Sequence, residues 1–131
     1  MSTVAREVQV SRGALWFGLF GGAAAWTVHL MLAYAAAEFG CVGRLGERGY
    51  LGISMVAWLE IALTVATTLA SGTATVVAYR GHRRLRSGEA AGDAAVAAEC
   101  YTAWAGVLTS GMFTFIILFE SIPIVYYLHS C

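Results

Sequence analysis

The stretch GLFGGAAAWTVHLMLAYAAAEFGC, residues 18–41, decides the class of fold. It is apolar over more than the roughly 20 residues that a helix needs to cross the hydrocarbon core of a bilayer. It also carries His29 near its middle, where an ionisable side chain is costly unless it has a partner or a function. The stretch therefore predicts a membrane-spanning helix with one polar position that needs an explanation.

The composition of the whole chain is that of a membrane protein. Of its 131 residues, 59% are hydrophobic and 12% are charged, whereas soluble domains average about 25% charged residues. The net charge is zero and every basic residue is an arginine, so the strong basic excess of a nucleic-acid-binding protein is absent. We expect a single domain whose partners include membrane lipids and no nucleic acid.

Two further apolar runs follow the first, and each is long enough to cross a membrane. We therefore expect an all-α, membrane-spanning bundle of three transmembrane helices, at about residues 13–39, 50–79 and 100–128. Residues 80–99 begin with RGHRRLR and are predicted to form an arginine-rich loop between the second and third spans. The first run lacks the short core and the cleavage site of a signal peptide, so we expect it to be retained.

The arginines predict the orientation of the bundle. Most of them lie before the first span or between the second and third: Arg6, Arg12, Arg80, Arg83, Arg84 and Arg86. Only Arg44 and Arg48 lie in the loop between the first and second spans. Because the arginine-rich side of a membrane protein stays in the cytoplasm, we expect the N-terminus inside and the C-terminus outside. The expected location is the inner (cytoplasmic) membrane of a bacterium, which the chain crosses several times.

This orientation gives the cysteines different environments. Cys41 and Cys131 would both lie at the outer side, where disulfides persist, and Cys100 would lie at the cytoplasmic side, where they are rare. We therefore predict a Cys41–Cys131 disulfide and a Cys100 that stays a thiol. The alternative is that Cys41 and Cys131 are separate thiols, either inert or metal-binding.

Three ionisable side chains are predicted to form an intramembrane polar cluster. His29, Glu60 and Glu120 come from three different spans and lie roughly 12–15 Å below their predicted outer ends. The cluster could lock the bundle or meet a partner subunit, it could relay protons or ions, or it could hold a metal. No ligand spacing typical of a metal site and no catalytic set is present, so we assign no metal ligands, no catalytic residues and no cofactor bound by this chain alone.

Small residues at four-residue spacing predict close helix contacts. Gly18 and Gly22 form such a pair in the first span, and Gly106 and Ser110 repeat the spacing in the third. Faces of this kind let helix backbones approach closely in lipid. We expect them to pack inside the bundle, with a dimer face as the alternative.

The pattern W-x-x-H-L-x-x-x-Y, formed by Trp26, His29, Leu30 and Tyr34 and followed by Cys41, resembles a group of short bacterial membrane proteins. The genes of that group often lie beside those of haem–copper terminal oxidases and of oxidase assembly factors. The end of the chain is also similar to that group, in residues Glu120, Ile122, Pro123 and Cys131. The resemblance covers the first span and about the last dozen residues, and the middle span matches no pattern of the group.

The resemblance implies a non-catalytic role. It points to an accessory subunit or an assembly or stability factor of a respiratory membrane complex, of the cytochrome c oxidase type, with haem or copper in the partner subunits. Two alternatives stay open. One is a small proton- or ion-conducting component, or part of a transporter, that uses His29, Glu60 and Glu120. The other is a metal or haem chaperone.

Overall fold

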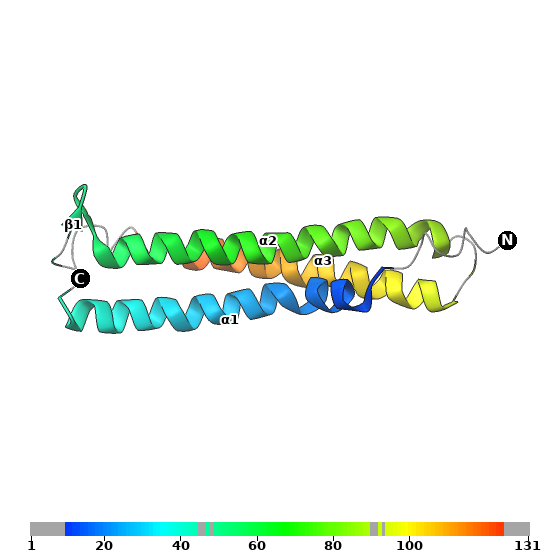
Figure 1. The fold of residues 1–131 in the computed structure, drawn as a ribbon, viewed down its shortest axis with the longest axis horizontal. Coiled ribbons are helices and arrows are strands. Elements are labelled where there is room, and N and C mark those ends of the chain that lie inside the picture. The colour runs from blue at the N-terminus through cyan, green and yellow to red at the C-terminus, as the bar shows by residue number, and fades with distance from the viewer. Residues whose placement is uncertain (1–9, 45–46, 48, 90–91, 93, 125–131) are drawn as a thin grey trace.

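The computed structural model describes residues 10–44, 47, 49–89, 92 and 94–124, and the side chains of residues 87–89 are not described. Its main elements are three helices, α1 (Arg12–Val42), α2 (Met55–Glu89) and α3 (Ala94–Glu120). All three are long and apolar enough to cross a membrane. They lie side by side along one axis (Figure 1), which confirms the predicted three-helix membrane bundle.

Local hydrogen bonds fix the two ends of α1. The hydroxyl of Ser11 accepts a hydrogen bond from the backbone N–H of Ala14, as expected of an N-cap residue. At the other end, the N–H of Gly43 donates to the carbonyl of Phe39, and Arg44 takes a positive φ of 58°. The helix therefore starts one residue earlier and ends three residues later than predicted.

A small hairpin replaces the predicted start of the second span. Strands β1 (Gly49–Tyr50) and β2 (Ile53–Ser54) pair antiparallel. The turn residues Leu51 and Gly52 have φ values of 56° and 77°, and positive φ at both positions is typical of tight hairpins. Helix α2 then begins at Met55, where the Ser54 hydroxyl accepts from the N–H of Ala57. The prediction that the span begins at about residue 50 is wrong because of this hairpin.

The predicted arginine-rich loop, residues 80–99, is mostly helical. Helix α2 continues to Glu89 and α3 already begins at Ala94. The reason lies in Leu85, which is completely buried against Leu15 of α1 and against Cys100 and Ala103 of α3. Burial of this leucine extends the helix through the arginines, whose side chains lie on its exposed face.

Helix α3 ends earlier than the predicted boundary at residue 128. Its last residue is Glu120, and turns follow at Ser121 and Ile122. Pro123 has no N–H to continue the helical hydrogen bonds, and a proline also disfavours helical geometry in the residue before it. Residues 125–128 of the predicted span lie outside the described part of the chain. In Figure 1, α3 stops short of the end of the bundle that carries the hairpin, which we call the hairpin end.

The tightest contact in the bundle joins α1 to α3. The hydroxyl of Ser110 donates to the carbonyl of Gly18 at 2.6 Å and accepts from the N–H of Gly22 at 3.2 Å. A Cβ atom placed on Gly22 would lie 2.5 Å from the Cα of Ser110, and one on Gly106 would lie 3.0 Å from the carbonyl carbon of Gly18. The four small residues singled out in the sequence therefore face one another inside this bundle.

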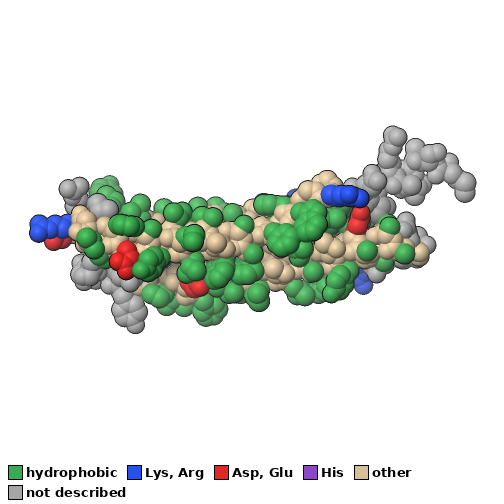
Figure 2. Space-filling view, turned by 90° about the horizontal axis from the view of Figure 1, so that it is seen from below, with side chains coloured by type: hydrophobic (Ala, Val, Ile, Leu, Met, Phe, Trp, Pro, Cys, Tyr) green, Lys and Arg blue, Asp and Glu red, His purple; other side chains and the backbone are tan. Residues whose placement is uncertain are grey.

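Hydroxyl groups join α2 to α3. Ser71 bonds the hydroxyl of Thr114 at 2.8 Å and donates to the carbonyl of Ser110 at 3.1 Å. Nearer the hairpin end, Thr64 and Ser121 are 2.9 Å apart. The helix contacts are thus built mainly from glycine, alanine and hydroxyl side chains, with a few buried larger residues such as Leu85 and Ile117, while most of the large apolar side chains lie outside. Figure 2 shows these apolar side chains along the length of one face, which is the surface that lipid requires.

A methyl group at Gly22 tests the α1–α3 contact. Gly22→Ala should destabilise the bundle by about 1–3 kcal/mol, because overpacking forces the two backbones apart. Gly72→Ala is the matched control, since a Cβ there meets nothing within 4 Å; it should be neutral or stabilising by up to about 1 kcal/mol. Reversible unfolding in mixed micelles measures both. Equal stabilities for the two variants would contradict the contact.

Candidate functional site

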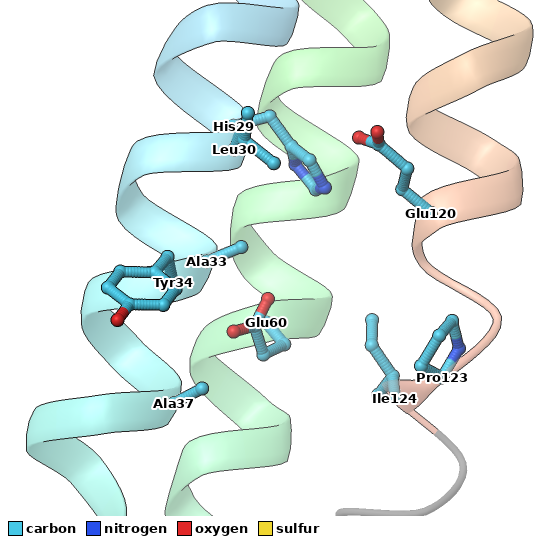
Figure 3. Close-up of a pocket in the computed structure, with 9 residues that line it drawn as sticks. All are labelled: His29, Leu30, Ala33, Tyr34, Ala37, Glu60, Glu120, Pro123 and Ile124. Carbon is cyan, nitrogen blue, oxygen red and sulfur yellow. The ribbon is translucent and has the colours of Figure 1, made fainter.

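A cleft of about 330 Å³ opens among the three helices on the hairpin side of the Gly22–Ser110 contact. Figure 3 shows residues of α1, α2 and the end of α3 around it. Its lining consists of His29, Leu30, Ala33, Tyr34, Ala37, Glu60, Glu120, Pro123 and Ile124. The three members of the predicted polar cluster therefore share one cleft, in surroundings that are otherwise mostly apolar.

His29 forms the inner end of the cleft. Its side chain is 3% exposed, and its Nδ1 lies 3.0 Å from the hydroxyl oxygen of Thr67 on α2. The Thr67 hydroxyl also donates to the carbonyl of Leu63 at 2.8 Å. Since that bond uses the hydroxyl proton, we assign the proton of the His29–Thr67 bond to Nδ1, which leaves Nε2 of the neutral ring as an acceptor.

Glu120 is held by a tryptophan. The indole N–H of Trp26 donates to the carboxyl Oε2 of Glu120 at 3.0 Å and so links α1 to the end of α3. The Trp26 ring also packs on Phe113, with ring centroids 5.3 Å apart. Glu120 itself is exposed, and Figure 3 shows its carboxyl group directed toward His29.

Glu60 is buried and has no partner among the residues that the structure describes. Its side chain is 6% exposed, and within the described residues its carboxyl group makes no hydrogen bond or ion pair. Among those residues, the Thr68 hydroxyl is the one side-chain polar atom that is fully enclosed and lacks a hydrogen-bond partner. The Glu60 oxygens are not fully enclosed and therefore reach the open space of the cleft. Burial without a partner is costly for a carboxyl group, which makes Glu60 the least satisfied polar group of the cluster.

The register between α1 and α2 sets the depth of Glu60. Gly40 faces Val56, and His29 bonds Thr67. In both pairs the residue numbers add up to 96, and this constant sum defines the register between the two helices. By this register, Glu60 lies level with position 36 of α1. That is about 10 Å from His29 along the bundle, toward the hairpin end.

Glu120 lies between the other two. Its neighbour Ser121 bonds Thr64, whose level is about 5 Å from that of His29 by the same rise per residue. The three groups therefore form a staggered row rather than a single level. The prediction of similar depths fails because α2 begins after the hairpin, which brings Glu60 nearer to the end of its helix than expected.

No cation of this chain lines the cleft in the described structure. Its lining contains no arginine, and the chain has no lysine. The described arginines all lie near the ends of the helices: Arg12, Arg44, Arg80, Arg83, Arg84 and Arg86. Within the described part of the chain, no arginine or lysine therefore balances the charge of the two carboxyl groups.

The opposite end of the bundle carries a second polar contact. His82 lies on α2, not in a loop as predicted, and its Nδ1 is 3.3 Å from both the carbonyl oxygen and the Sγ of Cys100. Its ring also packs against Trp104 of α3. Among the described residues, no three His, Cys, Asp or Glu side chains come close enough to hold a metal ion.

The predicted disulfide falls partly outside the described residues. Cys41 lies in the last turn of α1, at the hairpin end. Cys131 is not among the residues that the structure describes. The Cys41–Cys131 bond therefore stays a prediction. Cys100 lies buried at the opposite end, away from Cys41.

Two residues of the site were missed in the sequence. Thr67 positions His29, and Trp26 positions Glu120. A signal for Trp26 was present, because an indole N–H deep in a span needs an acceptor at the same depth. Thr67 gave no such signal, since it is one of several threonines in its span and most of them bond their own helix.

Comparison with protein-family models, with curated proteins and with solved structures found no match to this chain.

Replacing Thr67 by valine tests the support of His29. Thr67→Val keeps the shape of the side chain and removes the oxygen that Nδ1 contacts, which should destabilise the bundle by about 1–3 kcal/mol. Thr73→Val is the control, since Thr73 is exposed and bonds only its own helix. Nitrogen-15 NMR of the imidazole should show a protonated Nδ1 in the wild type and a changed tautomer balance in Thr67→Val. An identical His29 spectrum in both would contradict the assignment.

Proposed function

We propose that this chain is a non-catalytic accessory subunit, or an assembly or stability factor, of a respiratory membrane complex of the cytochrome c oxidase type. The observation that carries the subunit role is the exposed carboxyl group of Glu120, on a helix surface that is otherwise apolar. Its neighbours Phe115 and Phe119 are also exposed. A carboxyl group in such surroundings is costly in lipid, and a donor on a neighbouring subunit would satisfy it.

The assignment to a respiratory complex rests on the sequence pattern. Trp26 and His29 belong to the pattern shared with the oxidase-associated group, and Glu120 belongs to the similar chain end. In the fold, Trp26 bonds Glu120, and His29 lines the same cleft. The residues that carry the resemblance thus meet at one place, as expected if the group shares a contact there. Haem or copper would then belong to the partner subunits.

The proposed orientation places the N-terminus in the cytoplasm and the hairpin end outside, in the inner membrane of a bacterium. The arginines of α2 support it, because they gather at the end opposite the hairpin. In this orientation Cys41 faces an oxidising compartment, and we propose that it bonds Cys131 there. The bond would tie the end of the chain to the end of α1.

A second candidate is a proton-conducting component. The staggered row of Glu60, Glu120 and His29 favours it, since titratable groups at increasing depth are typical of proton relays. Beyond His29, however, the bundle is filled by the Gly22–Ser110 contact. A relay would therefore need a partner to complete its path.

Co-purification distinguishes the two. A tagged chain, expressed in a bacterium that carries its gene and extracted in mild detergent, should bring down oxidase subunits identified by mass spectrometry. Glu120→Gln should lower their recovery by about tenfold or more, because removing one partner of a buried charged contact costs about 2–5 kcal/mol. Glu38→Gln, an exposed acid of the same charge on α1, is the control. Recovery that is unchanged in Glu120→Gln, together with lost proton flux, would favour the relay instead.

The proposed disulfide has its own test. Under non-reducing conditions the wild-type chain should migrate faster than after reduction, and Cys131→Ser should abolish the difference. Cys100→Ser is the control and should leave it unchanged. Two alkylatable thiols at Cys41 and Cys131 in the untreated membrane protein would refute the bond.

A further inference from the structure

A long apolar groove runs between α1 and α2 on the outside of the bundle. Its volume is about 630 Å³, and its lining extends from Trp16 to Leu32 on α1 and from Leu63 to Ala70 on α2. Among the described lining residues, the one hydroxyl is that of Thr67, which already donates to the carbonyl of Leu63. None of these residues lines the polar cleft. The groove therefore suits an apolar occupant of its own.

Residues of very different size give the groove its shape. Gly21, Ala24 and Ala70 contribute a small side chain or none, whereas Trp16 and Phe20 are exposed and stack on each other with ring centroids 5.5 Å apart. Along α1 the lining covers roughly 24 Å at about 1.5 Å per residue. One leaflet of a bilayer is only about 15 Å deep in its hydrocarbon part. The groove is therefore long enough to take an acyl chain over its whole length.

Three arginines of α2 border a second hollow, which we call the arginine pocket. It has a volume of about 320 Å³ and is lined by Arg80, Arg83 and Arg84, all of them exposed. Within the described residues, the guanidinium groups of Arg80 and Arg83 make no ion pair or hydrogen bond. No described acidic side chain lines the pocket. The pocket therefore suits an anion.

The arginine pocket lies at the level of one end of the groove. A Cβ atom placed on Gly18 would lie 2.9 Å from the Cβ of Ala78, so these two residues are level with each other. The helices run in opposite directions (Figure 1), so Trp16 and Arg80 both lie two residues farther toward the same end of the bundle. The aromatic end of the groove is thus the arginine end of α2.

The pocket also lies on the groove side of α2. Arg84 follows Ala66 by 18 residues, which is five turns of about 3.6 residues, so both occupy the same face of the helix. Ala66 lines the groove. The Cα–Cβ bonds of a helix tilt toward its N-terminus, which for Arg84 is the direction of the groove. The apolar groove and the arginine pocket therefore form one continuous surface.

The charge of this surface decides between two apolar occupants. A second copy of the chain, inserted in the same orientation, would bring its own arginines to the same end, where like charges repel. A phospholipid with an anionic headgroup brings the opposite charge together with an acyl chain. Basic pockets of this kind at a membrane surface are typical binding sites for such headgroups.

We propose that the groove and the arginine pocket together bind one anionic phospholipid, taken from the leaflet at that end of the bundle. Its phosphate lies among Arg80, Arg83 and Arg84, where a guanidinium group can donate two parallel hydrogen bonds. One acyl chain lies in the groove, and the other stays in the bilayer. This inference goes beyond the proposed function and does not depend on which complex the chain joins.

Titration with lipids tests the site. The purified full chain in uncharged detergent micelles, followed by native mass spectrometry, should bind one molecule of phosphatidylglycerol. Phosphatidylcholine with the same chains should bind about tenfold more weakly or worse, because it carries no net charge. Dihexanoyl-phosphatidylglycerol should also bind at least about tenfold more weakly, since its short chains leave most of the groove empty. Equal affinity for phosphatidylglycerol and either of the other two lipids would overturn the proposal.

Two pairs of matched variants locate the site. Arg80→Gln should lower the affinity for phosphatidylglycerol about fivefold, whereas Arg44→Gln, exposed at the hairpin end, should bind as the wild type does. Ala70→Phe fills the groove and should lower the affinity about tenfold, whereas Ala62→Phe, exposed on α2 outside the groove lining, should not. Circular dichroism checks that helix content is unchanged.

Unchanged affinity in a folded Arg80→Gln or Ala70→Phe would overturn the proposal. A stable dimer in the presence of excess phosphatidylglycerol that Ala70→Phe abolishes would also overturn it, because it would show that a second copy occupies the groove. Either failure leaves the co-purification result untouched.

Discussion

The bundle depends on one hydroxyl group placed between two turns of a neighbouring helix. Ser110 of α3 bonds both the carbonyl of Gly18 and the N–H of Gly22. The close approach depends on Gly22 and Gly106, where a Cβ atom would lie 2.5 Å from the Cα of Ser110 and 3.0 Å from the carbonyl carbon of Gly18. In lipid, close contacts of this kind replace the hydrophobic effect as the source of helix association. The contact fixes α3 alongside α1 and sets their register. From it follows which residues of the two helices meet farther along the bundle.

The cleft is the consequence of that register and of a proline. Helix α3 runs beside α1 until Glu120, three residues before Pro123, which has no N–H to offer the helix. Helices α1 and α2 continue toward the hairpin. The groove between them is therefore no longer covered by α3, and it opens where His29 and Glu60 lie. The cleft therefore lies on the hairpin side of the Gly22–Ser110 contact, and His29, Glu60 and Glu120 line it.

The fold class could be predicted from the length of the three apolar runs, and each run forms one of the three helices. Their ends could not, because they depend on contacts between distant residues. Leu85 carries α2 through the arginines by packing on Leu15 and Cys100, and such burial is not visible in a local window of sequence. The polar residues of the cleft could be identified in the sequence, because an ionisable side chain in an apolar span is costly in lipid. Their staggered positions along the bundle could not be predicted, because the two-strand hairpin before Met55 shifts Glu60 along the bundle.

The central claim is that the α1–α3 register brings Trp26 and Glu120 together at the cleft. Solid-state NMR of the chain in lipid bilayers tests it directly, by magnetisation transfer between the ¹⁵N-labelled indole of Trp26 and the ¹³C-labelled carboxyl group of Glu120. The account predicts strong transfer, because the nitrogen and Oε2 are 3.0 Å apart. It also predicts weaker transfer in Gly22→Ala, where the helices must separate. No transfer in the wild-type chain would contradict the account.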